Sequence, residues 1–312
     1  MTVAPHVVVF GSVNMDLVAR VPRFVRAGET ILGDRFSTVP GGKGANQAVA
    51  VARLDVPVRM VGRVGQDAFG RALLDALAAQ GVDTAEVQAV PGSSGVAVIE
   101  VEVSGENRIT VIPGANGSVG VSDLERLDAA LEGAAVLLLQ LEVPLSVVVA
   151  AARLARARGV TVVLDPAPAT ELPAELYTLT DLITPNASEA AALVGFPVQS
   201  PGDAIRAAGV LRARGVPEVL IKRGAEGVLW AGSGAVQVLP AFPVEAIDTV
   251  AAGDAFNGGL AAALSEGCPL PEAISWGLAT AALSVTRPGA QDSLPSRTEV
   301  EALMAHVPAP SV

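Results

Sequence analysis

The stretch from Asp248 to Gly259, DTVAAGDAFNGG, sets two aspartates around a run of small residues where a helix is predicted to begin. The first turn of a helix offers unpaired N–H groups and the positive end of the helix dipole, which both favour an anion such as phosphate. The small residues would let a ligand approach the backbone. Asp254 therefore either caps the helix or stands beside a bound phosphate with chemistry to do, and this stretch alone leaves both interpretations open.

Polar residues also follow five short apolar runs that are predicted to be strands. Ligands of open parallel sheets bind beyond the carboxyl ends of the strands. Carboxylates and amides at these ends, with aromatic residues making up only 3% of the chain, would suit a polyol, because each hydroxyl both donates and accepts a hydrogen bond. The predicted strands are 7–11, 135–142, 160–166, 181–186 and 218–224, and the polar residues at this edge are Asn14, Asp16, Glu142, Asp165, Asn186 and Arg223.

Two glycine-rich stretches, PGGKGANQA (40–48) and GRVGQDAFG (62–70), superficially resemble phosphate loops. The first lacks the GxxxxGK[ST] spacing of a Walker A loop, and the second lacks the GxGxxG spacing of a dinucleotide fingerprint. Tight turns without a ligand remain an alternative for both stretches.

The elements between these motifs predict an α/β fold. Runs that are apolar on both faces are typical of a parallel sheet covered by helices, and helical stretches ending in glycine are predicted at 122–133, 144–159 and 200–215. Segment 12–21 alternates with a period of two, and 95–103 with 108–112 reads as a hairpin. We therefore expect one domain over 1–312, a doubly wound, mostly parallel sheet flanked by helices. A small inserted sheet from about 13–40 and 94–114 would form a lid and a homodimer contact.

The composition of the chain argues against two classes of binding partner, nucleic acids and membranes. The net charge of −11 argues against a nucleic-acid surface, and Gln140, Glu142 and Pro144 interrupt the most apolar stretch, 134–155, before it reaches membrane-spanning length. One cysteine excludes internal disulfides, and the N-terminus lacks the pattern of a signal peptide. We expect a cytoplasmic protein that binds neither nucleic acid nor membrane.

Six motifs together resemble the ribokinase/pfkB carbohydrate kinase family in order and approximate spacing, over nearly the whole chain to about Ser293. They are GSVNMD, PGGKGANQA, LQLEVP, ITPNASE, IKRGAEG and DTVAAGDAFNGG. The resemblance implies a ribokinase-like fold and ATP-dependent phosphorylation of a sugar. Within the family, GSVNMD with LQLE point to D-ribose, phosphorylated at its 5-hydroxyl.

The resemblance also implies roles for individual residues. Asp254 would be the catalytic base, and the amides of residues 251–254 would form an anion hole for the γ-phosphate. The sugar site would comprise Asn14, Met15, Asp16, Gly42, Lys43, Gly44, Ala45, Asn46, Glu142 and Asp254. ATP would contact Asn186, Lys222, Arg223, Gly224, Ala225, Glu226, Gly227, Ala251, Ala252, Gly253, Asp254 and Leu278.

Two kinds of metal ion follow from the same resemblance. Glu189, in the NxxE pattern with Asn186, would hold Mg²⁺ through water, although the beginning of a surface helix also explains this glutamate. A potassium ion would lie between two loops and activate the enzyme. Its ligands would come from Asp248, Val250, Ser284, Arg287, Gly289 and Ser293, mostly through backbone carbonyls.

Alternative functions remain at this point. A related kinase could act on deoxyribose, fructose or a nucleoside, although sparse aromatic residues disfavour a nucleoside base. A sugar-binding protein without catalysis is disfavoured by the intact Asp254, and a dehydrogenase by the missing GxGxxG. Leu278 falls where family members often have asparagine or histidine beside the adenine, so we expect apolar base contacts and loose nucleotide selectivity.

Overall fold

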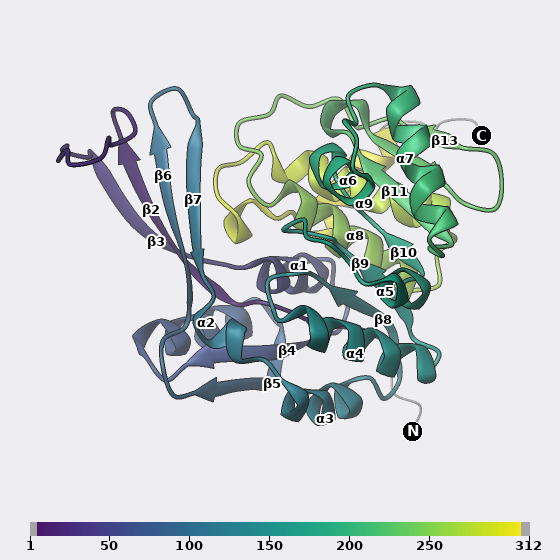
Figure 1. Cartoon of the computed structure of the whole chain (residues 1–312), viewed down its shortest axis with the longest axis horizontal. Coiled ribbons are helices and arrows are strands. Elements are labelled where there is room, and N and C mark those ends of the chain that lie inside the picture. Colours follow the sequence, from purple (N-terminus) through teal and green to yellow (C-terminus); the bar gives the residue numbers. More distant parts are fainter. Residues whose placement is uncertain (1–4, 307–312) are drawn as a thin grey trace.

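The computed structural model describes residues 5–306, which form a three-layer α/β/α arrangement with a second sheet projecting from one side (Figure 1). The central sheet has the strand order β13-β12-β11-β10-β9-β8-β1-β4-β5. Strands β11 to β5 in this order pair in parallel, and β12 and β13 complete one edge in antiparallel pairs. The strands are β1 (His6–Phe10), β4 (Val58–Gly65), β5 (Asp83–Val90), β8 (Ala134–Leu139), β9 (Thr161–Leu164), β10 (Leu182–Ile183), β11 (Glu218–Lys222), β12 (Val228–Ala231) and β13 (Gln237–Leu239).

Helices cover both faces of this sheet, as the runs of apolar residues on both sides of its strands require. One hydrophobic core lies under α1 (Lys43–Ala52), α2 (Ala68–Ala79), α8 (Ala252–Ser265), α9 (Leu270–Ser284) and α10 (Arg297–His306). The other core lies under α3 (Val121–Ala130), α4 (Leu145–Ala157), α5 (Ala174–Leu179), α6 (Ala187–Val194) and α7 (Pro201–Ala213). Short 3₁₀ turns occur at Gly114–Ser118, Gly224–Glu226 and Gln291–Ser293.

The second sheet has four strands in the order β3-β2-β6-β7 and rises away from the α/β body (Figure 1). Its strands are β2 (Asn14–Val21), β3 (Arg35–Gly41), β6 (Gly95–Glu102) and β7 (Asn107–Ile112). Strand β2 pairs antiparallel with β3 and parallel with β6, with Asp16 opposite Val39 and Ala97. The predicted period of two in 12–21 and the predicted hairpin are therefore confirmed.

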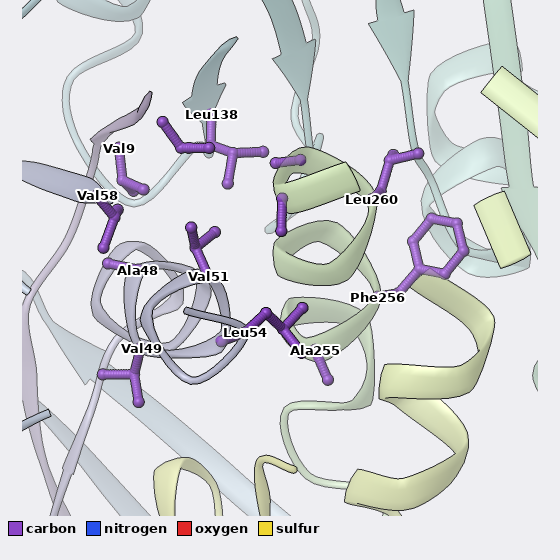
Figure 2. Packing of buried hydrophobic residues seen from close by; sticks show 14 of the residues in the cluster. Val9, Ala48, Val49, Val51, Leu54, Val58, Leu138, Ala255, Phe256 and Leu260 are labelled. Carbon is purple, nitrogen blue, oxygen red and sulfur yellow. The ribbon is translucent and has the colours of Figure 1, made fainter. Parts of the chain in front are cut away.

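Helices α1 and α8 cross closely because glycine and alanine lie at their contact. A β-carbon added at Gly258 would lie 2.3 Å from the Cβ of Ala50 and 3.1 Å from the carbonyl oxygen of Gln47. Figure 2 shows the two helices side by side in the core, with Leu54, which follows α1, next to Ala255 of α8. This packing brings the first turns of the two helices together.

The predicted fold class and all five predicted core strands are confirmed, while four strands escaped prediction: β4, β5, β12 and β13. The glycine-rich stretch 62–70 is the end of β4 followed by α2, whose N-cap Asp67 accepts a hydrogen bond from the backbone N–H of Gly70. Stretch 40–48 is the end of β3 followed by α1. Within residues 5–306, every helix is too short or too polar to span a bilayer.

Candidate active site

Asp254 lies in the first turn of α8, but its carboxylate does not cap the helix. The N-cap position is Ala251, which adopts a left-handed conformation with φ of 59°. The carboxylate instead faces α1, where Oδ2 accepts a hydrogen bond from Asn46 Nδ2 (3.0 Å) and Oδ1 accepts one from Gln47 Nε2 (3.1 Å). The interpretation of Asp254 as a helix cap alone is therefore wrong in this structure.

The environment of Asp254 changes its acidity. Burial raises the pKa of this carboxyl to about 6, with Lys43 and the hydrogen bonds from Asn46 and Gln47 opposing the rise and Asp165 adding to it. Asp254 is therefore a stronger base than an unperturbed aspartate, whose pKa is near 3.9. A base titrating near 6 is still ionised at neutral pH and accepts a proton more readily.

Three polar side chains meet where β2 begins and β8 ends, beside α1. Glu142 Oε2 accepts hydrogen bonds from Ser12 Oγ (2.5 Å), from the backbone N–H of Lys43 (3.2 Å) and, at the longer distance of 3.5 Å, from Asn14 Nδ2. Asn14 Oδ1 in turn accepts a hydrogen bond from Asn116 Nδ2 (2.7 Å). Asn14 and Glu142, both predicted for the sugar site, are therefore held in place. Asn116 holds Asn14 and Ser12 holds Glu142, and neither of these two residues was predicted to belong to the site.

Asp16 lies two residues along β2 from Asn14, on the same face of the strand. Burial, together with the negative charges of Glu142 and Asp254, raises its pKa to about 7. Gly41, on the neighbouring strand, makes room for this carboxylate, since an added β-carbon would lie 2.2 Å from Asp16 Oδ2. The three carboxylates of Asp16, Glu142 and Asp254 therefore surround one small region.

The loop into α1 follows the backbone of residues 12–14 closely because it contains glycine. Gly42 has φ of 91°, and a β-carbon at Gly44 would lie 2.7 Å from the backbone nitrogen of Ser12. Burial alone would lower the pKa of Lys43, but the charges of Asp254, Asp165, Glu142 and Glu189 outweigh it and raise that pKa. The side chains of Met15 and Ala45 belong to the hydrophobic core, which leaves their backbone for contact with a sugar.

A cavity of about 380 Å³ lies beside Asp254 and extends over the beginning of α8 to the end of β11. Lys43, which was predicted for the sugar site, also lines it, as do Asp165, Thr249 and Phe256, which were not predicted to contact a ligand. Arg223, Ala225 and Glu226 are not among its lining residues, and Arg223 forms an ion pair with Glu226 (2.5 Å). The predicted nucleotide residues that do line it are Asn186, Lys222, Gly224, Gly227, Ala251, Ala252, Gly253, Asp254 and Leu278.

Lys222 reaches across this cavity toward the start of α8. Its Nζ lies 3.1 Å from Asp165 Oδ1, and a β-carbon added at Gly253 would lie 3.3 Å from the same nitrogen. Asp165 also accepts a hydrogen bond from Gln47 Nε2 (3.0 Å). The start of α8 therefore has a lysine and its counterion beside it.

Glu189 combines the two roles that the sequence left open. It forms a capping box at the start of α6, accepting from the backbone N–H of Asn186 (2.7 Å), while Asn186 Oδ1 accepts from the N–H of Glu189 (2.8 Å). The same carboxylate lines the cavity, and burial raises its pKa against the opposing charge of Lys222. Within residues 5–306, no group of three or more His, Cys, Asp or Glu side chains is arranged to hold a metal ion.

Asp248 joins the two loops that were predicted to enclose potassium. Its Oδ1 accepts from the backbone N–H of Val250 (3.0 Å) and its Oδ2 from that of Gly289 (2.9 Å). The hydroxyls of Ser284 and Ser293 are buried and donate to the carbonyls of Ala281 and Ala290. The Arg287 guanidinium is held by Glu299, which leaves the Arg287 carbonyl as a candidate ligand.

Some of the missed residues carried a local signal and others did not. Ser12, Gln47 and Gln140 lie inside the motifs GSVNMD, PGGKGANQA and LQLEVP, so listing every polar residue of those motifs would have included them. Asn116 lies in the 3₁₀ turn after β7 and reaches Asn14 over more than a hundred residues of sequence. Only the fold connects these two asparagines.

Comparison with known proteins supports this arrangement. The ribokinase of Haemophilus influenzae is 44% identical over 299 residues, which cover 96% of this chain and 98% of that protein. The structure of Arabidopsis thaliana ribokinase complexed with ribose and ATP matches with a TM-score of 0.89 and 34% identity, covering 97% of this chain and 99% of that one. Thermotoga maritima ribokinase matches with a TM-score of 0.89 and 37% identity, covering 96% and 99%.

A family model described as pfkB family carbohydrate kinase matches residues 4–297, almost the entire described fold. This match includes every strand of both sheets and the residues around Asp254. The chain belongs to the pfkB family of carbohydrate kinases.

Proposed function

We infer that the chain catalyses the ATP-dependent phosphorylation of D-ribose at the 5-hydroxyl, which gives ribose 5-phosphate and ADP. The observation that carries this inference is the buried Asp254 carboxylate at the first turn of α8, between the sugar-side carboxylates and the 380 Å³ cavity. A base in this place can take the proton of a sugar hydroxyl while a phosphate lies over the helix start.

In the proposed mechanism the protein acts mainly by positioning and by charge. Asp254 accepts the proton of the attacking hydroxyl, and the amides of residues 251–254 stabilise the transferring phosphoryl group. Lys43 and Lys222 line the same cavity and add positive charge near the phosphates. Binding of both substrates would exclude water from Asp254, which is only 5% exposed.

The sugar would lie against β2 and the loop before α1. Asp16, Asn14 and Glu142 would exchange hydrogen bonds with the ring hydroxyls, and Gly42 to Asn46 would form the wall opposite them. Asn14 and Glu142 are already fixed by Asn116 and Ser12, so ribose would meet an ordered site. Such a site discriminates between sugars because an analogue lacking one hydroxyl leaves a buried partner unpaired.

ATP would occupy the cavity, with its phosphates over the start of α8. Gly224 and Gly227 admit the ribose and phosphates, and Leu278, which is 7% exposed, would contact the adenine through apolar atoms. Apolar contact distinguishes purines poorly, so we propose loose selectivity among purine nucleotides.

Glu189 would hold Mg²⁺ through water molecules beside the phosphates. The fit depends on its carboxylate, a hard oxygen ligand that lines the cavity, because Asn186 Oδ1 already accepts two hydrogen bonds. Magnesium commonly retains several waters and takes few protein ligands. The ion would neutralise charge on the phosphates of ATP.

Potassium would bind between the loops that Asp248 joins. The carbonyls of Val250, Ser284, Arg287 and Gly289, with Ser293 and the Asp248 carboxylate nearby, would provide oxygen ligands. The Ser293 hydroxyl donates to a carbonyl, so its oxygen still has acceptor capacity. The ion would order the backbone before α8 and would not contact the substrates.

A homodimer would form through the four-stranded sheet. Ile109 and Val111 of β7 are 56% and 43% exposed and, by strand register, lie on the same face as Ala97 and Asp16. A second copy covering this apolar face would also cover the sugar. Sedimentation equilibrium of the wild type and of Ile109→Asp tests this proposal, and a monomeric wild type at micromolar concentration would contradict it.

We propose a cytoplasmic location, because the single cysteine provides no intramolecular disulfide.

The test of the activity is a coupled assay that measures ADP release with D-ribose, 2-deoxyribose, fructose and a nucleoside. The highest kcat/KM is expected for D-ribose, and a preference for any other sugar would replace it as the substrate. Absence of ADP release with every sugar would contradict kinase activity.

A further inference from the structure

Gln47 lies between two carboxylates of the site and has no role in the mechanism so far. It follows Lys43 by one turn of α1 and is fully buried. Its Nε2 donates to Asp254 Oδ1 (3.1 Å) and to Asp165 Oδ2 (3.0 Å), and its Oε1 accepts from Gln140 Nε2 (2.7 Å). One amide group therefore contacts the catalytic base, the counterion of Lys222 and the end of β8.

The orientation of this amide is decided by its surroundings. An amide nitrogen carries two donor hydrogens, and the two carboxylates offer one acceptor to each of them. The reversed orientation would place Oε1 against both carboxylates, which would be repulsive. The charges around Gln47 therefore fix which of its atoms faces Asp254.

Helix packing sets the reach of Gln47. The backbone carbonyl oxygen of Gln47 would lie 3.1 Å from a β-carbon added at Gly258, which lies one turn after Asp254 on α8. Figure 2 shows α1 and α8 side by side in this region. The close crossing allows a glutamine side chain to span the gap from α1 to the Asp254 carboxylate.

We propose that Gln47 is a positioning residue for Asp254 and that it holds one carboxylate oxygen while Asn46 holds the other. One hydrogen bond on each oxygen fixes the plane of the carboxyl group and leaves a lone pair for the sugar hydroxyl. The shared amide also keeps Asp254 and Asp165 from competing for a proton, as two close carboxylates otherwise do. This inference rests on the proposed kinase function.

The acidity of Asp254 supports this role. The hydrogen bonds from Asn46 and Gln47 oppose the rise of its pKa to about 6 that burial causes. The charged groups facing Asp254 are Lys43 from α1, Asp165 from the end of β9 and Asp16 from β2. All three remain when only Gln47 is changed, so loss of its hydrogen bond should raise the pKa of Asp254.

Gln47→Met, which keeps the length of the side chain and removes its amide, is the test variant. We expect kcat to fall about 10- to 100-fold, because the base loses its orientation, and KM for ribose and ATP to stay within about threefold. The acid limb of the kcat profile should move to higher pH. Thr280→Val is the control for helix packing, since Thr280 donates to the backbone carbonyl of Trp276 within α9 and lies against Gly259 of α8.

Gln140→Met provides a second, independent test, because the amide nitrogen of Gln140 donates to Gln47 and not to Asp254 or Asp165. It should lower kcat by about three- to tenfold, and the double variant should be no slower than Gln47→Met alone. If Gln47→Met does not fold, Gln140→Met decides: a lower kcat at constant KM supports the proposal and an unchanged kcat overturns it.

Other outcomes separate this inference from the proposed function. Gln47→Met with kcat within twofold of wild type and an unmoved acid limb would overturn the positioning role. Losses that multiply in the double variant would also overturn it. A wild type that phosphorylates no sugar would refute the proposed function, while a wild type active on a sugar other than ribose would leave the Gln47 test to be run on that sugar.

Discussion

The proposed sugar side and the proposed nucleotide side of the site present their ligand groups in different ways. On the sugar side, side chains hold one another: Asn116 holds Asn14, and Ser12 holds Glu142. On the nucleotide side, the backbone provides more of the shape, with positive φ at Ala251, Gly224 and Gly227, whereas the sugar side has positive φ at Gly42. Sugar recognition should therefore be sensitive to single side-chain changes, and nucleotide binding should depend more on the backbone.

The largest effect is expected at Asp254, where the two sides meet. Asp254→Asn keeps the shape and the Asn46 contact region but removes the proton acceptor, so kcat should fall about 10² to 10⁴-fold. Ribose and ATP should each bind within about threefold of wild type, as measured by calorimetry. Wild-type turnover in this variant would contradict the assignment of Asp254 as the catalytic base.

Asp16→Ala sharpens the comparison on the sugar side. Each buried hydroxyl left unpaired costs about 1 to 3 kcal/mol, so ribose affinity should fall about 5- to 150-fold. ATP affinity should change less than threefold, because Asp16 does not line the cavity. Unchanged ribose affinity in calorimetry would exclude Asp16 from the sugar site, and an equal loss for ATP would contradict the separation of the two sides.

The pH profiles of kcat and of kcat/KM for ribose should also distinguish the two sides. Asp16 has a pKa of about 7 and Asp254 one of about 6, and both are raised mainly by burial. Each group is ionised above its own pKa, so as pH falls Asp16 gains its proton first and loses acceptor capacity. The kcat/KM for ribose, which reports free enzyme, should therefore decline from a higher pH than kcat does. In Asp16→Asn the decline near pH 7 should disappear.

The same contrast explains how far the sequence alone could lead. The core strands were predictable because each is a continuous apolar run, and Asn14 with Asp16 because a period of two places them on one face. The antiparallel edge strands β12 and β13 and the strands β4 and β5 were missed, because their short or interrupted runs resemble turns. The stretch 62–70 resembles a phosphate loop because of its glycines, but its first residues belong to β4, which pairs with β1.

Within the site, residue type carried more information than conformation did. Asp254 stood out as a carboxylate in a run of small residues, but whether it capped its helix depended on Asn46 and Gln47, about two hundred residues away. The left-handed conformation of Ala251 has no sequence signal, because alanine rarely adopts it. The pKa of Asp254 was also beyond prediction, since burial is a property of the packed fold.

Potassium dependence tests the backbone side of the comparison. Asp248 joins the loops on either side of the proposed ion, so we expect potassium to raise kcat several-fold over sodium at equal ionic strength, with little change in KM. Asp248→Ala should reduce that difference, since it removes the hydrogen bonds to Val250 and Gly289. Equal rates in potassium, sodium and tetramethylammonium, after removal of contaminating potassium, would refute the ion's role.

The smallest effect is expected for Ala251→Gly, which changes the backbone side without removing a functional group. Ala251 has φ of 59° and ψ of 10°, a conformation that costs a residue with a β-carbon about 1 to 2 kcal/mol. Glycine relieves that cost, but it gains conformational entropy in the unfolded chain, worth about 0.4 to 1 kcal/mol in the opposite direction. The free energy of unfolding in urea should therefore rise by about 0 to 1.6 kcal/mol.

Ala252→Gly is the matched control for this change, because Ala252 is the first residue of α8. At that place glycine should lower the free energy of unfolding by about 0.5 to 1 kcal/mol. The amides of the anion hole are present in both variants, so KM for ATP should stay within about threefold of wild type. A larger loss of stability in Ala251→Gly than in Ala252→Gly would contradict the strained conformation. A tenfold rise in KM for ATP, with stability unchanged, would instead show that the β-carbon of Ala251 holds the loop in shape, and that a side chain governs the nucleotide side as well.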